Sequence, residues 1–293
     1  MTINWYPGHM HKARREIKDA LPEIDVVIEM LDARLPFSSA NPVLGKLARH
    51  KPTLKLLSKS DLADSAITEE WLAFFNEQAN TSALPIVTSD PKTLLPIARL
   101  CQQLGSQVRE SRSVKALVIG IPNVGKSTLI NSLAGRKIAK VGNEPAVTKR
   151  QQRIQVGERL QITDTPGVLW PRIENRNSAY RLAASGAIRN TAMDYEDVGL
   201  WTAESLLLRY PNAIMARYKL KQLPETGALL LAQIAARRGG LRAGGTVDLH
   251  RASEVLLHDL RGGQLGRLSL ERPLDIPLEL ATEDELVDLN ESE

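Results

Sequence analysis

Short apolar runs alternate with longer amphipathic stretches along the first half of the chain. Four runs rich in branched apolar residues predict buried strands, at residues 25–32, 53–57, 83–88 and 114–119. Helical spacing predicts helices between them, at residues 44–49, 68–78 and 94–110. Strands that alternate with helices favour a mostly parallel sheet with helices on both faces. Residues 153–163 alternate about Gly157 and Glu158, which indicates an antiparallel hairpin at the sheet edge.

The pattern changes beyond about residue 175. Helical spacing dominates there, and it predicts helices at residues 198–210, 226–238 and 248–260. Pairs of glycines separate these helices. We therefore expect two domains: an α/β domain over residues 1–175, and a smaller, mainly helical domain over residues 176–293 that ends in an acidic tail.

Composition narrows the class of protein. The 293 residues are 43% hydrophobic and 25% charged, which is ordinary for a globular protein. A pI near 9.2 at a net charge of +4 is a mild indication of nucleic-acid contact. Cys101 is the only cysteine, so an intramolecular disulfide is excluded. No apolar run is long enough to span a membrane and the N-terminus lacks the features of a signal peptide, so we expect a cytoplasmic protein.

Residues 120–127 fit the phosphate-binding pattern G-x-x-x-x-G-K-[ST], and they stand between a predicted strand and a predicted helix. The glycines let successive backbone amides face phosphates, and the helix N-terminus adds partial positive charge. Lys126 is expected to reach the β- and γ-phosphates, and Ser127 to ligate Mg²⁺. The alternative is a glycine turn with an incidental lysine.

Two further positions suit the same chemistry. Asp164 follows the second hairpin strand, where a carboxylate could enter the Mg²⁺ shell while the Gly167 amide contacts the γ-phosphate. In a chain without a phosphate loop, residues 164–167 would be interpreted as a plain turn. Thr148 lies between the two motifs and is a candidate Mg²⁺ ligand from its position alone.

The chain looks like a translation-factor-class GTPase, and more narrowly it resembles the YlqF/RbgA family of circularly permuted ribosome-assembly GTPases. The resemblance rests on residues 5–10, 32–36, 58–61, 120–128 and 164–167, in that order. A base-reading motif that precedes the phosphate loop is the specific feature. The resemblance implies a circularly permuted P-loop GTPase domain followed by a helical domain. Cutting and rejoining the chain between surface elements preserves the face of the sheet that binds the nucleotide.

The base-reading motif departs from the family pattern at one position. Ser58, Lys59, Ser60 and Asp61 stand where Asn-Lys-x-Asp is usual. Asp61 is positioned to accept from the N1–H and amine of guanine, donors that adenine lacks there, so we expect guanine selectivity. Ser58 is shorter than asparagine, so we expect somewhat weakened affinity. The complete predicted nucleotide set is Ser58, Lys59, Ser60, Asp61, Thr88, Ser89, Asn123, Val124, Gly125, Lys126, Ser127, Thr128 and Gly167.

The predicted catalytic residues are His9, Lys126 and Thr148. Val168 and Leu169 follow the switch glycine, so no side chain there can orient water as the glutamine of Ras-like enzymes does. The resemblance implicates His9 instead; the alternative is a surface histidine. Resemblance to potassium-activated GTPases suggests that Asn123 helps to hold K⁺. Slow intrinsic hydrolysis that depends on a partner is expected.

Basic residues mark two surfaces. His11, Arg14, Arg15 and Lys18 form a stripe on a predicted helix, and Arg237, Arg238 and Arg242 form a second cluster. Both could be solvated faces, but the resemblance implies a monomer that binds GTP or GDP and the rRNA and proteins of the maturing large ribosomal subunit. GTP hydrolysis would then drive a late assembly step and release. The alternatives are a nucleotide-gated RNA-binding switch without hydrolysis and a GTPase of tRNA modification or membrane transport.

Overall fold

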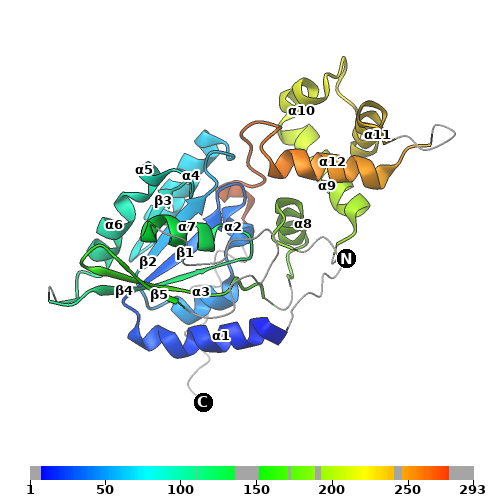
Figure 1. The fold of residues 1–293 in the computed structure, drawn as a ribbon. Helices are drawn as coiled ribbons and strands as arrows, with labels where there is room; N and C mark the ends of the chain where they lie inside the picture. Colours follow the sequence, from blue (N-terminus) through cyan, green and yellow to red (C-terminus); the bar gives the residue numbers. More distant parts are fainter. Residues whose placement is uncertain are drawn as a thin grey trace.

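A computed structural model describes residues 8–109, 111–135, 152–170, 173–188, 193–240 and 246–276. Within these residues a six-stranded sheet has the order β3-β2-β1-β4-β6-β5 (Figure 1). Its strands are β1 (Val26–Asp32), β2 (Thr53–Ser58), β3 (Thr81–Pro85), β4 (Val114–Gly120), β5 (Gln152–Val156) and β6 (Leu160–Asp164). All neighbouring pairs are parallel except β5 with β6. The predicted mostly parallel sheet with an antiparallel edge hairpin is confirmed.

Helices connect and cover these strands. They are α1 (Gly8–Ala20), η1 (Leu21–Glu23), α2 (Pro36–Ser39), α3 (Pro42–Ala48), α4 (Ser65–Asn76), α5 (Pro91–Leu94), α6 (Pro96–Leu104) and α7 (Lys126–Ala134). Helix α1 lies along one side of the sheet and buries Ala13 and Ile17, one turn apart, in the core (Figure 1). The apolar side chains of β1 and β4 are fully or almost fully buried, so the central strands form the core of this half.

Two predicted boundaries differ from the structure. The helix expected over residues 94–110 is two helices, α5 and α6, and the second ends at Leu104. Pro96 begins α6, and it has no amide hydrogen to donate to a preceding turn. Strand β3 ends at Pro85 instead of extending to residue 88, since its pairing with β2 covers Thr81 to Pro85. Both differences arise from proline and strand pairing, not from the hydrophobic pattern.

The second half is helical, with α8 (Arg176–Ser185), α9 (Tyr195–Arg209), α10 (Pro211–Tyr218), α11 (Gly227–Arg238), α12 (Leu249–Arg261) and η3 (Pro273–Asp275). Helices α9 to α12 form a group beside the sheet, and α8 lies between the two (Figure 1). The helices predicted at 198–210, 226–238 and 248–260 are confirmed as α9, α11 and α12, whereas α8 and α10 were not predicted. The domain boundary at residue 175 stays a prediction.

The chain returns from α12 to the α/β half. Residues 262–276, called the return segment below, pack against residues that follow β1 and β2. Ile276 contacts a small apolar cluster that contains Leu31, Leu57 and Trp71. The Trp71 indole donates to the carbonyl of Glu271 at 3.3 Å. The last described stretch of the chain is therefore built into the first half of the molecule.

Candidate nucleotide site

The sheet brings the predicted motifs to one edge. In the spatial order β2-β1-β4-β6, the base-reading residues follow β2, residues 32–36 follow β1, the phosphate loop follows β4, and residues 164–167 follow β6. These four strands are parallel, so their carboxyl ends lie side by side. A ligand site at the carboxyl ends of parallel strands is the usual arrangement of open α/β sheets. The motif order along the chain thus does not prevent a single site.

The phosphate loop requires its glycines. Gly120 has φ of +153° and Gly125 has φ of +104°, both in backbone regions that other residues rarely adopt. A Cβ on Gly120 would also lie 2.6 Å from the carbonyl oxygen of Met30 on the neighbouring strand. Lys126 begins α7, so the loop ends at a helix N-terminus. This geometry suits an anion bound by backbone amides.

Lys126 is buried against the loop that it follows. Its Nζ donates to the carbonyls of Gly120 at 2.9 Å and Ile121 at 2.7 Å. Burial lowers the pKa of Lys126 to about 8, although the attraction of Asp164 acts in the opposite direction. Ser127 and Thr128 follow in the first turn of α7, and both are half-buried. The amine and the helix N-terminus therefore lie in one place.

Asp164, at the end of β6, carries a buried carboxylate. Its side chain is 0% exposed, and burial raises its pKa to about 6 against the opposing attraction of Lys126. The backbone amide of Thr165 also favours the charge, but neither carboxylate oxygen has a hydrogen-bond partner of acceptable geometry among the described residues. Such an oxygen pair is costly unless a ligand completes it. Asp164 with the hydroxyl of Ser127 fits Mg²⁺, which prefers oxygen ligands.

Gly167 lies against the phosphate loop. A Cβ there would be 2.9 Å from the Cα of Pro122 and 3.1 Å from the Nζ of Lys126. The next amide, of Val168, donates to the carbonyl of Gly120 at 3.3 Å. Only glycine permits this approach, which brings the backbone after β6 to the amine that would meet a phosphate.

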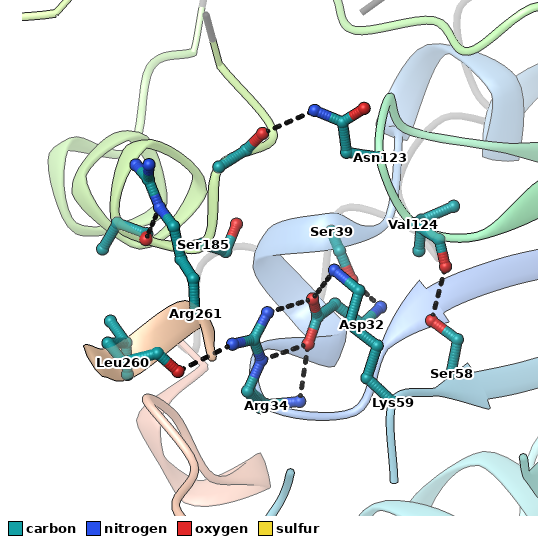
Figure 2. Close-up of polar contacts among 12 residues, drawn as sticks. Asp32, Arg34, Ser39, Ser58, Lys59, Asn123, Val124, Ser185, Leu260 and Arg261 are labelled. Atoms are coloured by element: carbon teal, nitrogen blue, oxygen red, sulfur yellow. Dashed lines mark hydrogen bonds and ion pairs between the residues drawn. The ribbon is translucent and has the colours of Figure 1, made fainter. Parts of the chain in front are cut away.

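Ser58 links the base-reading residues to the phosphate loop. The side chain is fully buried, and its Oγ lies 2.8 Å from the carbonyl oxygen of Leu31. It lies at the same distance from the carbonyl oxygen of Val124 (Figure 2). One hydroxyl hydrogen can be donated to only one of them at a time. Serine therefore makes the connection between loops, while a longer side chain would be needed to reach further toward a base.

The other base-reading residues have distinct surroundings. Lys59 has φ of +56°, and its Nζ donates to Asp32 at 2.9 Å. Ser60 bonds to the carbonyl of Ile86 through both its amide, at 3.2 Å, and its hydroxyl, at 3.1 Å. Asp61 is exposed, so its carboxylate is accessible to a ligand. The motif thus combines residues held by hydrogen bonds with an exposed acidic side chain.

Thr88 and Ser89 lie after β3. The methyl of Thr88 would be 3.4 Å from a Cβ on Gly125, which places Thr88 beside the phosphate loop. Ser132 of α7 donates to the Thr88 carbonyl at 2.8 Å, whereas Ser89 is exposed. Thr88 is therefore closer to the loop than Ser89.

Asn123 has an unusual backbone conformation within the phosphate loop. Its φ is +59°, and its Nδ2 donates to the carbonyl of Gly186, at the end of α8, at 2.9 Å (Figure 2). The amide oxygen is the atom whose chemistry suits K⁺. His9 lies in the first turn of α1, where side chains are outside the described residues, and Thr148 is outside them altogether. The structure leaves the roles of both as predictions.

Asp32 and Arg34 lie within residues 32–36, which contribute to the family resemblance, but the sequence alone predicts no role for either side chain. Arg34 is 1% exposed and forms a two-pronged pair with Asp32, with Nε to Oδ1 at 2.9 Å and Nη2 to Oδ2 at 2.7 Å (Figure 2). Burial alone would raise the pKa of Asp32, but the charges of Arg34 and Lys59 outweigh it and hold that pKa far below its usual range. The signal was present: two opposite charges directly after an apolar strand.

The parallel sheet, with its phosphate loop and base-reading residues at one edge, is the arrangement of a P-loop GTPase. Comparisons with known proteins support the same class. Residues 115–202 match the family described as 50S ribosome-binding GTPase. Ribosome biogenesis GTPase A of Bacillus cereus is 42% identical over 93% of this chain and 95% of its own length. The chain belongs to the ribosome biogenesis GTPase A family, as its motifs indicated, and it is a GTPase.

Solved structures of YlqF have the same fold. A GDP-bound structure has a TM-score of 0.66 at 28% identity, and covers 89% of this chain and 100% of that one. The GNP-bound YlqF from T. maritima has a TM-score of 0.65 at 28% identity, with 90% and 100% covered. Membership of a GTPase family implies a requirement for Mg²⁺, which the unsatisfied oxygens of Asp164 fit. No described helix has the length and apolar character needed to cross a bilayer.

Proposed function

We propose that this GTPase binds the maturing large ribosomal subunit in its GTP form, and that hydrolysis drives a late assembly step and its release. The relatives carry names of ribosome biogenesis and 50S binding, which supports the choice of partner. The single observation that carries the nucleotide part is Asp164, a buried carboxylate beside Lys126 whose oxygens have no hydrogen-bond partner of acceptable geometry among the described residues.

We assign the phosphate end as follows. Amides of residues 123–128 and the amine of Lys126 bind the phosphates, and Gly167 contacts the γ-phosphate. Ser127, Asp164 and Thr148 hold Mg²⁺, which when bound screens the charge that develops on the transferred phosphoryl group. His9 orients the attacking water. Lys126 and Asp164 need no large movement, because both are already buried at the same sheet edge.

At the base end, Asp61 selects guanine and Lys59 packs along the base, with Thr88 and Ser89 beside it. The exposed Asp61 and the anchored Lys59 support this division. GTP should bind at least a hundredfold more tightly than ATP in a calorimetric titration, because adenine leaves the Asp61 carboxylate without its donors. Equal affinity for ATP and GTP would contradict the assignment.

We also propose a K⁺ site at Asn123, and a monomer that acts in the cytoplasm. Asn123 lies within the phosphate loop, and its side chain carries an amide oxygen of the kind that ligates K⁺. Turnover in KCl should exceed turnover in NaCl. Equal rates in the two salts would remove the K⁺ assignment without affecting the Mg²⁺ site.

Contacts with rRNA are proposed for residues 176–293 and for α1. Arg14, Arg15 and Lys18 of α1 are exposed, as are Arg237 and Arg238 at the end of α11. His11 and Arg242 of the same predicted clusters lie outside the residues whose side chains are described. Exposed cations bind phosphate without sequence preference, and their binding weakens as salt rises.

One experiment tests the proposed partner. The protein is sedimented with large ribosomal subunits in a GTP analogue, in GDP and without nucleotide, and phosphate release is measured with and without the subunits. Retention only with the analogue, with release of phosphate accelerated by the subunits, is expected. Equal sedimentation in all three states, or hydrolysis that subunits do not change, would contradict the proposal.

A further inference from the structure

The return segment packs directly on the base-reading loop, defined here as residues 58–64. The amide of Leu268 donates to the carbonyl of Leu62 at 3.0 Å, and the amide of Asp64 donates to Ser269 Oγ at 3.3 Å. A Cβ on Gly263 would lie 2.7 Å from the side chain of Leu62. These contacts join positions about two hundred residues apart. The return segment therefore stabilises the conformation of the base-reading loop.

Arg34 connects this return segment to the charged pair under the loop. Its carbonyl accepts from the Leu270 amide at 2.7 Å, and its Nη1 donates to the Leu260 carbonyl, in the last turn of α12, at 3.3 Å. The other two prongs of the guanidinium hold Asp32, whose Oδ2 also accepts from Lys59. A single buried side chain thus contacts both α12 and the carboxylate that fixes the base-reading lysine (Figure 2).

A second route joins the same helices to the phosphate loop. Arg261, next to Leu260, donates to the last-turn carbonyls of α8, Ala183 and Ala184, at 2.8 Å each. Gly186, which ends α8, accepts from Asn123 of the phosphate loop. Because Ser58 joins the phosphate loop back to the base-reading loop, the polar contacts form a closed circuit through both nucleotide loops and two helix ends.

We propose that Arg34 is a positioning residue that couples the guanine end of the site to the docking of α12 and the return segment. It acts through Asp32 and Lys59 and touches no nucleotide itself. The guanidinium is planar and its N–H donors point in fixed directions. A displacement of α12 at Leu260 would therefore move Arg34 and Asp32, and through Asp32 also Lys59. The coupling is reciprocal: a guanine nucleotide favours the docked helices, and the docked helices favour the nucleotide. This inference rests on the proposed function of the base-reading loop.

The first test replaces the guanidinium of Arg34 by an ammonium group and so keeps the positive charge. In Arg34→Lys the ammonium cannot reach Asp32 and Leu260 together, so the dissociation constant of fluorescent GDP should rise about tenfold. The KM for GTP should rise by a similar factor, whereas kcat at saturating GTP should stay within about twofold, because the phosphate end is unchanged. A purely structural role would lower the thermal midpoint without this split.

The second test leaves the nucleotide loops and the Asp32 pair intact. Arg261→Met removes the bonds from α12 to the end of α8, and GDP affinity should fall about fivefold through the shared helix ends. Arg217→Met is the matched control. It removes the ion pair between Arg217 of α10 and Asp259 of α12, which is not part of the circuit. This variant should leave GDP affinity unchanged. A third experiment uses the unaltered protein. Hydrogen exchange of the Leu268 and Leu270 backbone amides is measured with and without GDP, and GDP should slow this exchange.

Each outcome decides something. Weaker GDP binding in Arg34→Lys and Arg261→Met, with Arg217→Met unaffected, supports the coupling. GDP binding within twofold in Arg34→Lys, equal effects of Arg261→Met and Arg217→Met, or unchanged exchange at Leu268 and Leu270 overturns it. If Arg34→Lys does not fold, the Arg261→Met comparison and the exchange experiment decide. An unaltered protein that binds no guanine nucleotide would instead refute the proposed function.

Discussion

The two ends of the nucleotide site treat a buried carboxylate in opposite ways. Asp32, under the base-reading loop, is satisfied by Arg34 and Lys59, and its pKa lies far below the usual range. Asp164, at the phosphate end, has no hydrogen-bond partner among the described residues, and burial raises its pKa to about 6. A satisfied buried charge fixes local structure, whereas an unsatisfied one is suited to a ligand. The contacts of the proposed base end are thus already made, whereas the proposed phosphate end contains a carboxylate that is suited to a ligand.

The largest effect should come from removing the charge at the phosphate end. In Asp164→Asn, subunit-stimulated phosphate release should fall about a thousandfold, since Mg²⁺ loses an anionic ligand and charge neutralisation at the transferred phosphoryl group weakens. Release is measured at saturating Mg²⁺ and GTP. Glu158→Gln, in the exposed turn of the same hairpin, is the control and should be unaffected. An Asp164→Asn protein with more than a tenth of the activity would contradict the assignment.

At the base end the dominant loss should be stability. Asp32→Ala leaves the buried Arg34 without its carboxylate and beside the half-buried Lys59, so the free energy of unfolding in urea should fall by roughly 3–5 kcal/mol. Glu70→Ala breaks the surface pair with Arg272 and should cost about 1 kcal/mol or less. Similar losses in the two variants would show that Asp32 is not held as the contacts indicate.

The phosphate end should also affect stability through pH. The folded pKa of Asp164, about 6, lies above its ordinary value of 3.8, so folding favours the protonated form. The contribution of Asp164 to the free energy of unfolding is complete below the ordinary pKa of 3.8, and it is lost as pH rises through 6. Between pH 7 and 5 this group should add about 1 kcal/mol to the free energy of unfolding in EDTA without nucleotide. Asp164→Asn should lack that gain; a wild-type slope in this variant would refute the shift.

The smallest effect should come from the connection between the two ends. Ser58→Ala removes a hydroxyl shared by the carbonyls of Leu31 and Val124, so GDP affinity should fall about twofold, equivalent to ~0.5 kcal/mol. Titration with fluorescent GDP measures it, with Ser106→Ala, at an exposed position after α6, as the control. A loss of more than tenfold would mean that Ser58 contacts the base itself.

The sequence allowed the sheet, its hairpin edge and most long helices to be predicted, because these follow from hydrophobic period. The phosphate loop was also predictable, since its glycines are needed at fixed spacing. The partners of Arg34 were not: Leu260 and Leu270 are remote in sequence, and carbonyl and amide groups leave no residue-type signal. The acceptors of Ser58 could not be predicted for the same reason, because they are the backbone oxygens of Leu31 and Val124.

The return segment also sets an order of events during synthesis. Leu268, Ser269 and Leu270 bond to residues made about two hundred positions earlier, so the base-reading loop lacks these contacts until the ribosome has translated past residue 270. The sheet can form before that point, since its six strands end by Asp164. A chain interrupted before residue 268 can therefore contain every nucleotide motif and still lack the support that completes the guanine end. Full assembly of the site thus requires translation of the segment that contains residues 268–270.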